Sequence, residues 1–285
     1  MSSTPTSTDR YAVMGYPVQH SWSPFIHGMF AKQTGQALVY ARIEVAPDRL
    51  SQAVAQFFDE GGKGLNITVP HKQAAAALVR WRTPRASIAG AINTIALQDG
   101  GWLGDNTDGA GLINDLTRNL HVKLADSRIL LLGAGGAARG VLGPLLGAAP
   151  ARLEVVNRNV DRALELVEEF EALGEIHAFG FDNVTREPFD LIINATSASL
   201  QGATLPVPAE AVSRSTVCYD MAYGKGDTPF TRWGKQAGAA RAEMGWGMLV
   251  EQAAEAFELW RGVRPETASV LKALTSPPPP RQAVV

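Results

Sequence analysis

The segment from Ile129 to Gly140 limits the fold of this chain more than any other, because it reads as a strand, a glycine turn and a helix in direct succession. Residues 129–132 are apolar and uncharged, as expected of a strand buried on both faces of a parallel sheet. Gly133 and Gly135 follow at once, and apolar residues then recur at the three- and four-residue spacing of an amphipathic helix. This order predicts an α/β unit with a parallel sheet.

Glycines at such a turn allow the backbone to approach a pyrophosphate, whose charge is held by the free N–H groups at the helix N-terminus. Ala138 occupies the third small-residue position of the G-x-G-x-x-G/A pattern, where the helix packs close to the strand. Flavin, nicotinamide and S-adenosylmethionine proteins share this outline, so the motif by itself does not identify the ligand. The pyrophosphate-binding residues are predicted to be those of the turn, Gly133, Ala134, Gly135, Gly136 and Ala137.

A second strand, predicted over Leu153–Val156, ends in Asn157 and Arg158. An enzyme that selects NAD usually carries Asp or Glu there to bind the ribose 2′-hydroxyl, whereas arginine suits a 2′-phosphate. Arg162 lies one helical turn further and could reach the same phosphate. The pattern therefore favours NADP, although two solvated arginines at a helix start would look the same in the sequence.

The composition excludes several classes of protein. The chain has 285 residues, 46% of them hydrophobic and 19% charged, which suits a globular protein of about two domains. A net charge of −2 gives no reason to expect nucleic acid or an anionic membrane as a partner. No apolar stretch is long enough to span a bilayer, and residues 1–10 lack the apolar core of a signal peptide. The single cysteine, Cys218, lies in an apolar run and is expected to be a buried thiol, so we expect a cytoplasmic protein.

The strand predicted over Gly64–Val69 carries polar residues that a strand covered on both faces should not contain. Alternation places its aliphatic residues on one face and Asn66 and Thr68 on the other, where they need partners or a cleft. Next, Pro70 and His71 open an alanine-rich helix that puts Lys72 at the positive end of a helix dipole. That position disfavours a charged ammonium and suits a lysine acid or base. A merely exposed lysine is the alternative.

Two more polar residues lie at predicted helix starts. Ser23 is expected to cap the helix that Pro24 begins, which leaves Ser21 available for contact with a ligand. Asp108 precedes the helix that leads from the first domain into the second, so its simplest role is also that of an N-cap.

Polar residues also follow the later strands. Thr196 and Ser197 come after a strand predicted over Leu191–Asn194, at the strand end where doubly wound sheets bind ligands. Another strand is predicted over Val217–Met221. The last long helix, predicted over Trp246–Arg261, carries Gln252 outside its apolar stripe, which usually marks a solvated position. Four consecutive prolines after Ser276 indicate an extended or disordered tail.

Several motifs occur in a specific order and spacing. Besides the glycine loop they are His20-Ser21-Trp22-Ser23-Pro24, Asn66-Ile67-Thr68-Val69-Pro70-His71-Lys72, Ala89-Gly90-Ala91-Ile92-Asn93-Thr94, Gly104-Asp105-Asn106-Thr107-Asp108-Gly109, Asn194-Ala195-Thr196-Ser197 and Gly247-Met248-Leu249-Val250-Glu251-Gln252. With them the chain closely resembles the shikimate dehydrogenase family, from Tyr11 to about Leu274.

The resemblance implies an α/β protein of two domains. Residues 1–107 and 246–285 would form a substrate-binding domain with a mixed, mainly parallel sheet, and residues 108–245 a Rossmann-like NADP-binding domain. It further implies reversible, NADP-dependent reduction of 3-dehydroshikimate to shikimate in aromatic amino-acid biosynthesis. The implied partners are the small-molecule substrates, with a homodimer as a possible assembly.

The resemblance also implies roles for individual residues. Ser21 and Ser23 would hold the substrate carboxylate, and Tyr223 would lie near the cleft. The substrate hydroxyls would be surrounded by Asn66, Thr68, Lys72, Asn93, Asp108 and Gln252. The adenosine 2′-phosphate would lie on Asn157, Arg158 and Arg162, and further cofactor contacts would come from Thr196, Ser197, Met221 and Gly245.

A substrate with one carboxylate and several hydroxyls needs many short polar side chains and few charges, which agrees with this set. Lys72 and Asp108 are the lysine–carboxylate pair that the motifs offer. Our hypothesis is that Lys72 exchanges the hydroxyl proton while Asp108 orients Lys72 and the substrate. Facing domains also suggest closure that expels water before hydride transfer. The five histidines are not spaced as a metal-ligand cluster, so no metal is expected.

The chain departs from the family pattern at Asn159, at Met244 and in the loop Ala198-Ser199-Leu200, whereas Trp246 fills a variable position. These departures affect the expected cofactor affinity and the loop on the nicotinamide side, not the proton-transfer pair. The nearest alternative is a quinate/shikimate dehydrogenase that uses NAD or both cofactors. A non-catalytic dinucleotide sensor is a further alternative, and a methyltransferase is disfavoured because no acidic residue follows the second strand.

Overall fold

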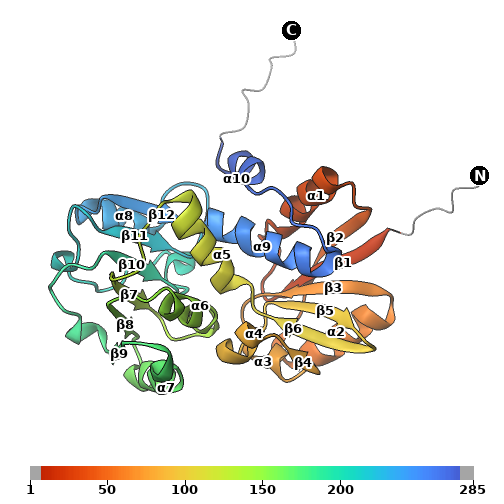
Figure 1. Cartoon of the computed structure of the whole chain (residues 1–285), viewed down its shortest axis with the longest axis horizontal. Helices are drawn as coiled ribbons and strands as arrows, with labels where there is room; N and C mark the ends of the chain where they lie inside the picture. The colour runs from red at the N-terminus through yellow and green to blue at the C-terminus, as the bar shows by residue number, and fades with distance from the viewer. Residues whose placement is uncertain (1–7, 277–285) are drawn as a thin grey trace, which may run out of the picture.

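The computed structural model describes residues 8–276, which form two α/β lobes that lie side by side (Figure 1). Each lobe is built on one six-stranded sheet. The tail predicted after Ser276 and most of the segment 1–10 lie outside the described residues. Within residues 8–276, no helix is both long and apolar enough to cross a membrane.

The first lobe contains a mixed sheet in the order β2-β1-β3-β5-β6-β4. β1 is parallel to β2 and β3, and β4 is parallel to β6, whereas β5 is antiparallel to both β3 and β6. Parallel pairs thus outnumber antiparallel ones, as predicted. The strands are β1 (Asp9–Gly15), β2 (Leu38–Glu44), β3 (Gly62–Ile67), β4 (Trp81–Arg82), β5 (Thr94–Gln98) and β6 (Gly101–Asp105).

Helices cover both faces of this sheet. On one face, Val54 and Phe57 of α2 pack with Leu65 of β3 in a buried apolar cluster. On the other face α1 and α9 lie together, with Phe30 and Phe257 in edge-to-face contact. The helices of this lobe are α1 (Ser23–Thr34), a 3₁₀ turn at Pro47–Arg49, α2 (Leu50–Asp59), α3 (Lys72–Ala76), α4 (Pro84–Ala89), α9 (Trp246–Arg261) and α10 (Ala268–Thr275).

The second lobe contains a sheet in which all neighbours are parallel, in the order β12-β11-β10-β7-β8-β9. The order reverses between β7 and β10, and doubly wound sheets bind their ligands at such a switch point. The strands are β7 (Arg128–Leu132), β8 (Arg152–Val156), β9 (Ile176–Phe179), β10 (Leu191–Asn194), β11 (Val217–Asp220) and β12 (Arg241–Met244). The helices are α6 (Gly136–Gly147), α7 (Val160–Phe170) and α8 (Pro229–Gln236), with 3₁₀ turns at Glu171–Leu173, Phe181–Asn183, Ser199–Gln201 and Ala209–Ala211.

Two adjacent helices join the lobes. α5 (Asp108–Asn114), continued by a π-helical turn at Asp115–Asn119, leads from the first lobe into the second, and α9 returns from it (Figure 1). They pack closely because Gly111 has no side chain: a Cβ there would lie 2.8 Å from the backbone nitrogen of Gln252. Both paths between the lobes are therefore helical and packed against each other.

Several local expectations were wrong. Ser23 is the first residue of α1 rather than its cap, and Asp108 is the first residue of α5 rather than its cap. β3 ends at Ile67, although the N–H of Thr68 still bonds to the carbonyl of Met14 at 2.9 Å. Strands β4, β9 and β12 and helices α4, α8 and α10 were not anticipated, because each has eight residues or fewer and offers little periodic signal.

Cys218 is fully buried in β11, as predicted. Burial raises the pKa of its thiol to about 12, so the thiol stays protonated at neutral pH. This environment makes Cys218 a core residue rather than a nucleophile.

Candidate active site

Lys72 and Asp108 meet where the two lobes join. Lys72 begins α3 and Asp108 begins α5, and the Lys72 Nζ lies 2.6 Å from Asp108 Oδ2. Their side chains are 16% and 6% exposed, so the ion pair is mostly shielded from water but not sealed. The carbonyl of Lys72 accepts a hydrogen bond from the N–H of Ile92 at 2.7 Å, which holds α3 against the first-lobe sheet. The lysine–carboxylate pair expected from the motifs is thus assembled.

Asn93 holds the second oxygen of Asp108. Its Nδ2 lies 2.9 Å from Asp108 Oδ1, 2.8 Å from Thr107 Oγ1 and 3.3 Å from Gln252 Oε1. The N–H of Thr107 donates to Asn93 Oδ1 at 2.9 Å. Asn93 therefore links the start of α5 with α9, and both carboxylate oxygens of Asp108 have a fixed partner.

Gln252 is half-buried rather than solvated, contrary to the sequence expectation. Its Nε2 donates to the carbonyl of Leu249 at 2.8 Å, which directs its Oε1 toward Asn93. The expectation that a residue outside the apolar stripe is solvated failed here, because α9 is covered on two sides, by the first-lobe sheet and by α5.

Asn66 is buried at the end of β3 and held by three groups. Its Nδ2 donates to the Asn93 carbonyl at 3.2 Å and to Thr94 Oγ1 at 3.0 Å, and its Oδ1 accepts from Tyr40 Oη at 2.6 Å. A carboxamide has two donor hydrogens and an oxygen with two lone pairs. One acceptor position of Asn66 is therefore left for a ligand hydroxyl. Thr68 lies nearby, half-buried, and it fits only because Gly15 has no Cβ, which would come within 2.4 Å of the Thr68 methyl group.

Ser21 and Ser23 lie together at the start of α1. Both are buried, and their Oγ atoms are 3.1 Å apart. The guanidinium of Arg42 donates to the Ser21 carbonyl at 2.8 Å and fixes this turn.

The glycine loop of the second lobe abuts Lys72. Gly133 has φ of +110°, a conformation that L side chains rarely adopt, and its N–H bonds to the Val156 carbonyl at 2.7 Å. α6 begins at Gly136 without a side-chain cap, so its first-turn N–H groups are available to a phosphate. A Cβ at Gly136 would lie 3.6 Å from Lys72 Cβ. This fits a dinucleotide pyrophosphate bound close to the proton-transfer pair.

The expected 2′-phosphate residues lie where β8 ends and α7 begins. Arg158 and Arg162 are exposed there, and Asn157 Nδ2 donates to the Asn159 carbonyl at 2.8 Å. Asn159, one of the departures from the family pattern, caps α7 by accepting from the N–H of Asp161 at 3.0 Å. Two exposed guanidinium groups just after β8, the strand that pairs with β7, fit a phosphate monoester.

The strand ends of β10 and β11 form the other side of the cofactor face. Asn194 Oδ1 accepts from the N–H and hydroxyl of Thr196, and the carbonyl of Asn194 accepts from the N–H of Met221 at 3.0 Å. Gly245 approaches Met221 so closely that a Cβ there would lie 2.5 Å from the Met221 carbonyl oxygen. Ser197 is exposed. These residues follow the carboxyl ends of β10, β11 and β12, the edge of the sheet at which doubly wound sheets bind ligands.

Tyr223 follows β11 and packs against Trp246 of α9, with ring centroids 4.7 Å apart. Burial raises the pKa of its phenol to about 12, so the hydroxyl remains a hydrogen-bond donor over the whole physiological range. Tyr223 is therefore suited to meet an anionic ligand group.

Three residues of the bonded network were not selected from the sequence: Tyr40, Thr94 and Thr107. Thr94 and Thr107 lie inside quoted motifs, each beside a selected residue, and that proximity was an available signal. Tyr40 had no such signal, because it reaches Asn66 only through the parallel pairing of β1 with both β2 and β3.

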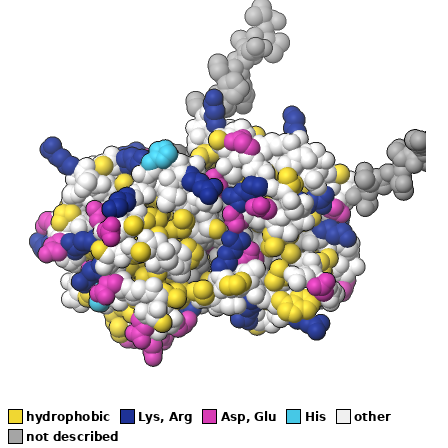
Figure 2. Space-filling view, viewed as in Figure 1, with side chains coloured by type: hydrophobic (Ala, Val, Ile, Leu, Met, Phe, Trp, Pro, Cys, Tyr) yellow, Lys and Arg dark blue, Asp and Glu magenta, His cyan; other side chains and the backbone are white. Residues whose placement is uncertain are grey.

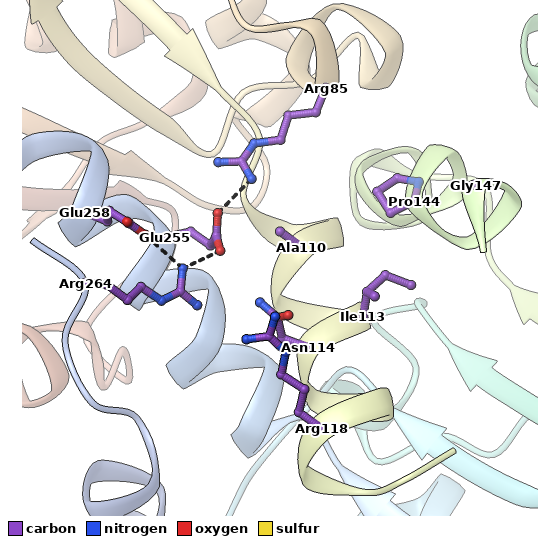
Figure 3. Close-up of a pocket in the computed structure, with 10 residues that line it drawn as sticks. All are labelled: Arg85, Ala110, Ile113, Asn114, Arg118, Pro144, Gly147, Glu255, Glu258 and Arg264. Carbon is purple, nitrogen blue, oxygen red and sulfur yellow. Dashed lines mark hydrogen bonds and ion pairs between the residues drawn. The ribbon is translucent and has the colours of Figure 1, made fainter. Parts of the chain in front are cut away.

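A hollow between the lobes lies apart from this site. It has a volume of about 600 Å³ and opens on the face where basic and acidic side chains gather between the lobes (Figures 2 and 3). Its lining residues are Arg85, Ala110, Ile113, Asn114, Arg118, Pro144, Gly147, Glu255, Glu258 and Arg264, which include no expected ligand-binding residue. Arg85 pairs with Glu255 at 2.8 Å, and Arg264 pairs with Glu255 and with Glu258 at 3.2 Å. These ion pairs tie α4 to α9 within the first lobe.

No group of three potential metal ligands occurs in the part of the chain that the structure describes.

Known proteins match this chain along most of its length. Three family models match it: the shikimate dehydrogenase substrate-binding domain over residues 13–95, the shikimate/quinate 5-dehydrogenase model over residues 115–218 and the shikimate 5-dehydrogenase C-terminal domain over residues 245–275. A shikimate dehydrogenase (NADP(+)) of Alkalilimnicola ehrlichii is 54% identical over 267 residues, which cover 94% of this chain and 98% of that protein.

Solved structures agree with these matches. An Ael1 enzyme from Pseudomonas putida superposes with a TM-score of 0.88 at 46% identity, covering 94% of this chain and 99% of that one. A shikimate 5-dehydrogenase from Thermus thermophilus, in complex with NADP(H) and shikimate, gives a TM-score of 0.81 at 32% identity, covering 93% of this chain and 98% of that one.

Proposed function

The chain belongs to the shikimate dehydrogenase family, and from this membership we propose that it catalyses the reversible, NADP-dependent reduction of 3-dehydroshikimate to shikimate, a step of aromatic amino-acid biosynthesis. The observation that carries the proposal is the Lys72–Asp108 pair at 2.6 Å, next to the glycine loop that would hold the cofactor. Acid–base chemistry and a dinucleotide site are the two things that an alcohol dehydrogenase without a metal needs.

Lys72 is the proton carrier in this proposal. In ketone reduction its ammonium donates a proton to the carbonyl oxygen, and in alcohol oxidation the neutral amine takes the hydroxyl proton back. Asp108 holds the ammonium in place and, with Asn93 on its second oxygen, cannot turn away from it. When bound, the nicotinamide supplies the hydride donor or acceptor.

The remaining polar side chains would orient the ring. Ser21, Ser23 and the phenol of Tyr223 offer hydroxyl donors to the carboxylate, and Asn66 offers an acceptor to a hydroxyl. Thr68, Asn93 and Gln252 complete the set. All of these residues except Tyr223 come from the first lobe, which supports a substrate subsite on that lobe.

The cofactor would be held by the second lobe. Residues 133–137 and the first turn of α6 suit the pyrophosphate, Asn157, Arg158 and Arg162 the 2′-phosphate, and Thr196, Ser197, Met221 and Gly245 the nicotinamide side. The paired guanidinium groups are the feature that favours NADP over NAD.

We also propose the division into residues 1–107 with 246–285 and residues 108–245, the two parts closing on the substrate. The hollow of Figure 3 supports this division: Arg85, Glu255 and Arg264 of the first part are joined to one another by ion pairs, and Pro144 and Gly147 of the second part take no part in them.

One assay tests the proposed function. The purified protein is mixed with shikimate or quinate and with NADP or NAD, and formation of reduced nicotinamide is followed by its absorbance. Turnover should be fastest with shikimate and NADP. Faster turnover with NAD or quinate would favour the alternative dehydrogenase, and no turnover with any pair would contradict the assignment.

A cytoplasmic location and a homodimer are the finer parts of the proposal. A single buried thiol and a cofactor of the cell interior support the location, which cell fractionation tests. Light scattering after gel filtration tests the assembly, since a mass near the 30.4 kDa of one chain would contradict a dimer.

A further inference from the structure

We propose that Trp22 and Trp246 are positioning residues, which form with Tyr223 an aromatic bridge between the lobes that holds Tyr223 and the Ser21–Ser23 turn at the substrate carboxylate. The inference rests on the proposed function and deepens it. The aromatic bridge consists of Trp22 at the start of α1, Trp246 at the start of α9 and Tyr223 after β11.

The three rings are in continuous contact. Trp22 meets Trp246 edge to face, with centroids 5.9 Å apart and planes at 74°. Trp246 meets Tyr223 at 4.7 Å with planes at 42°. Both arrangements lie in the range that attracts aromatic rings. The contacts run from the first lobe, through the first residue of α9, to the second lobe.

Trp22 is tied to the expected carboxylate subsite by its place in the chain. It stands between Ser21 and Ser23, and its carbonyl accepts from the N–H of Ile26 at 3.1 Å. The N–H of Ser23 in turn lies 3.3 Å from Ser21 Oγ. Any rotation of this turn that moves the indole of Trp22 therefore moves both hydroxyls.

Trp246 is held rigidly by the two glycines that flank it. A Cβ at Gly245 would lie 2.5 Å from the Met221 carbonyl oxygen, and a Cβ at Gly247 would lie 1.9 Å from Asp115 Oδ1. Asp115 is itself buried and accepts from Tyr219 Oη at 2.6 Å. Because the backbone on both sides of Trp246 touches fixed groups, its ring projects from a defined point.

Tyr223 needs such a support. It lies in an irregular segment between β11 and α8, followed by Gly224 and by Gly226 at φ of +81°. Glycines leave a loop many alternative conformations. The ring of Trp246 restricts where the Tyr223 phenol can lie, and Trp22 makes that position depend on the serine turn. Because the three rings are in contact, closure of the lobes would also change the positions of the hydroxyls at the carboxylate subsite.

The test is steady-state kinetics of Trp246→Ala and Trp246→Phe in the intact protein. We expect KM for shikimate to rise about tenfold in Trp246→Ala and to return within about threefold of wild type in Trp246→Phe, because phenylalanine retains a ring. KM for NADP should stay within about twofold. Trp81→Phe, on β4 and outside the site, is the matched control and should behave as wild type.

A double-mutant cycle with Tyr223→Phe separates positioning from general stability. If Trp246 acts through Tyr223, Trp246→Ala should add little to the KM effect of Tyr223→Phe, since coupled residues are non-additive. Additive effects, an unchanged KM for shikimate in Trp246→Ala, or an equal rise in KM for both substrates would overturn the proposal. If Trp246→Ala does not fold, Trp22→Leu replaces it, because Trp22 is 39% exposed and leucine keeps an apolar side chain at this position.

Wild-type turnover is measured first. Absence of turnover with shikimate and NADP would refute the proposed function. Normal wild-type turnover combined with an unchanged Trp246→Ala variant would refute only the aromatic bridge.

Discussion

The two lobes prepare their ligand sites in opposite ways. In the first lobe, buried and half-buried side chains hold one another: Asp108, Asn93, Gln252 and Asn66 are linked by hydrogen bonds of 2.9–3.3 Å. In the second lobe, the expected cofactor contacts are backbone N–H groups at a glycine turn and two exposed arginines. The first site is thus a network of hydrogen-bonded side chains, whereas the second depends on the backbone shape of the glycine turn and on the positive charge of the two arginines.

Ligand size and burial explain this difference. A buried polar side chain is costly unless it is hydrogen-bonded, so a site for a small polyhydroxylated ring must have its partners in place beforehand. A dinucleotide lies along the rim of a sheet, where water still solvates the arginines and glycine backbone does the recognition. Substitutions in the first lobe should therefore alter turnover or substrate KM, and those in the second lobe cofactor KM.

The largest effect is expected from Lys72→Ala, which removes the proton carrier. Since acid–base groups contribute ~10²–10⁴-fold, kcat should fall at least ~10²-fold with a modest change in KM for shikimate. Steady-state assays with shikimate and NADP measure kcat and KM. Lys63→Ala, at an exposed lysine of β3, is the control. Near-normal turnover of Lys72→Ala would remove Lys72 from the chemistry.

The next effect belongs to the second lobe. Replacing both Arg158 and Arg162 by Gln should raise KM for NADP roughly tenfold or more, because two charged partners of the 2′-phosphate are lost. KM for NAD and KM for shikimate should hardly change. Arg214→Gln, an exposed arginine far along the chain, is the control. A parallel loss for NAD would mean that these arginines do not read the 2′-phosphate.

A smaller effect is expected from Tyr40→Phe, which removes one hydrogen bond of the first-lobe network. Asn66 Oδ1 would lose its 2.6 Å partner and the amide could turn. With about 1 kcal/mol for such a bond, KM for shikimate should rise roughly fivefold. KM for NADP should be unaffected, and equal changes in both would show that the network extends into the cofactor lobe.

The smallest effect concerns pH and stability. His27 is buried and stacked on Tyr40 with centroids 4.3 Å apart, and burial lowers its pKa to about 3. The unfolded chain, with an ordinary histidine pKa near 6.5, therefore binds more protons between about pH 3 and 6.5. The contribution of neutral His27 to the free energy of unfolding is fully present above this range. It declines as the pH falls, by about 1 kcal/mol between pH 6.5 and 5.5.

Urea titration at both pH values measures this decline, with His27→Phe as the comparison. Phenylalanine preserves an aromatic ring and cannot titrate, so the pH dependence of this variant should be shallower by that amount. An identical slope in both proteins would show that His27 is not the group responsible.

Much of the second lobe could be predicted from local patterns. The apolar run before Gly133, the turn and the amphipathic helix after it are consecutive in sequence, and the observed β7 and α6 follow that order. The end of β8 at Val156 and the helix start near Val160 were equally local. The elements missed there include the short helix α8 and the strands β9 and β12, four-residue strands whose pairing is decided by neighbours rather than by their own composition.

The first-lobe site could be predicted only in part. Motifs named Lys72, Asp108, Asn66 and Asn93, but the cap roles expected of Ser23 and Asp108 were wrong, because both hydroxyl and carboxylate are used by partners outside their own helix. Gln252 was expected to be solvated because the apolar stripe of a helix identifies only one of its buried faces.

Residue chemistry along the chain determined the elements, the glycine that must adopt φ of +110°, and the kinds of group available to the substrate and cofactor. Only the tertiary structure decided that the Nζ of Lys72 lies 2.6 Å from Asp108, that Tyr40 reaches Asn66, and that Trp22, Trp246 and Tyr223 touch. The reason is physical. Backbone preferences act between residues that are near in sequence, whereas the hydrophobic effect is non-directional: it favours an interior position for a residue but does not specify which residue it contacts.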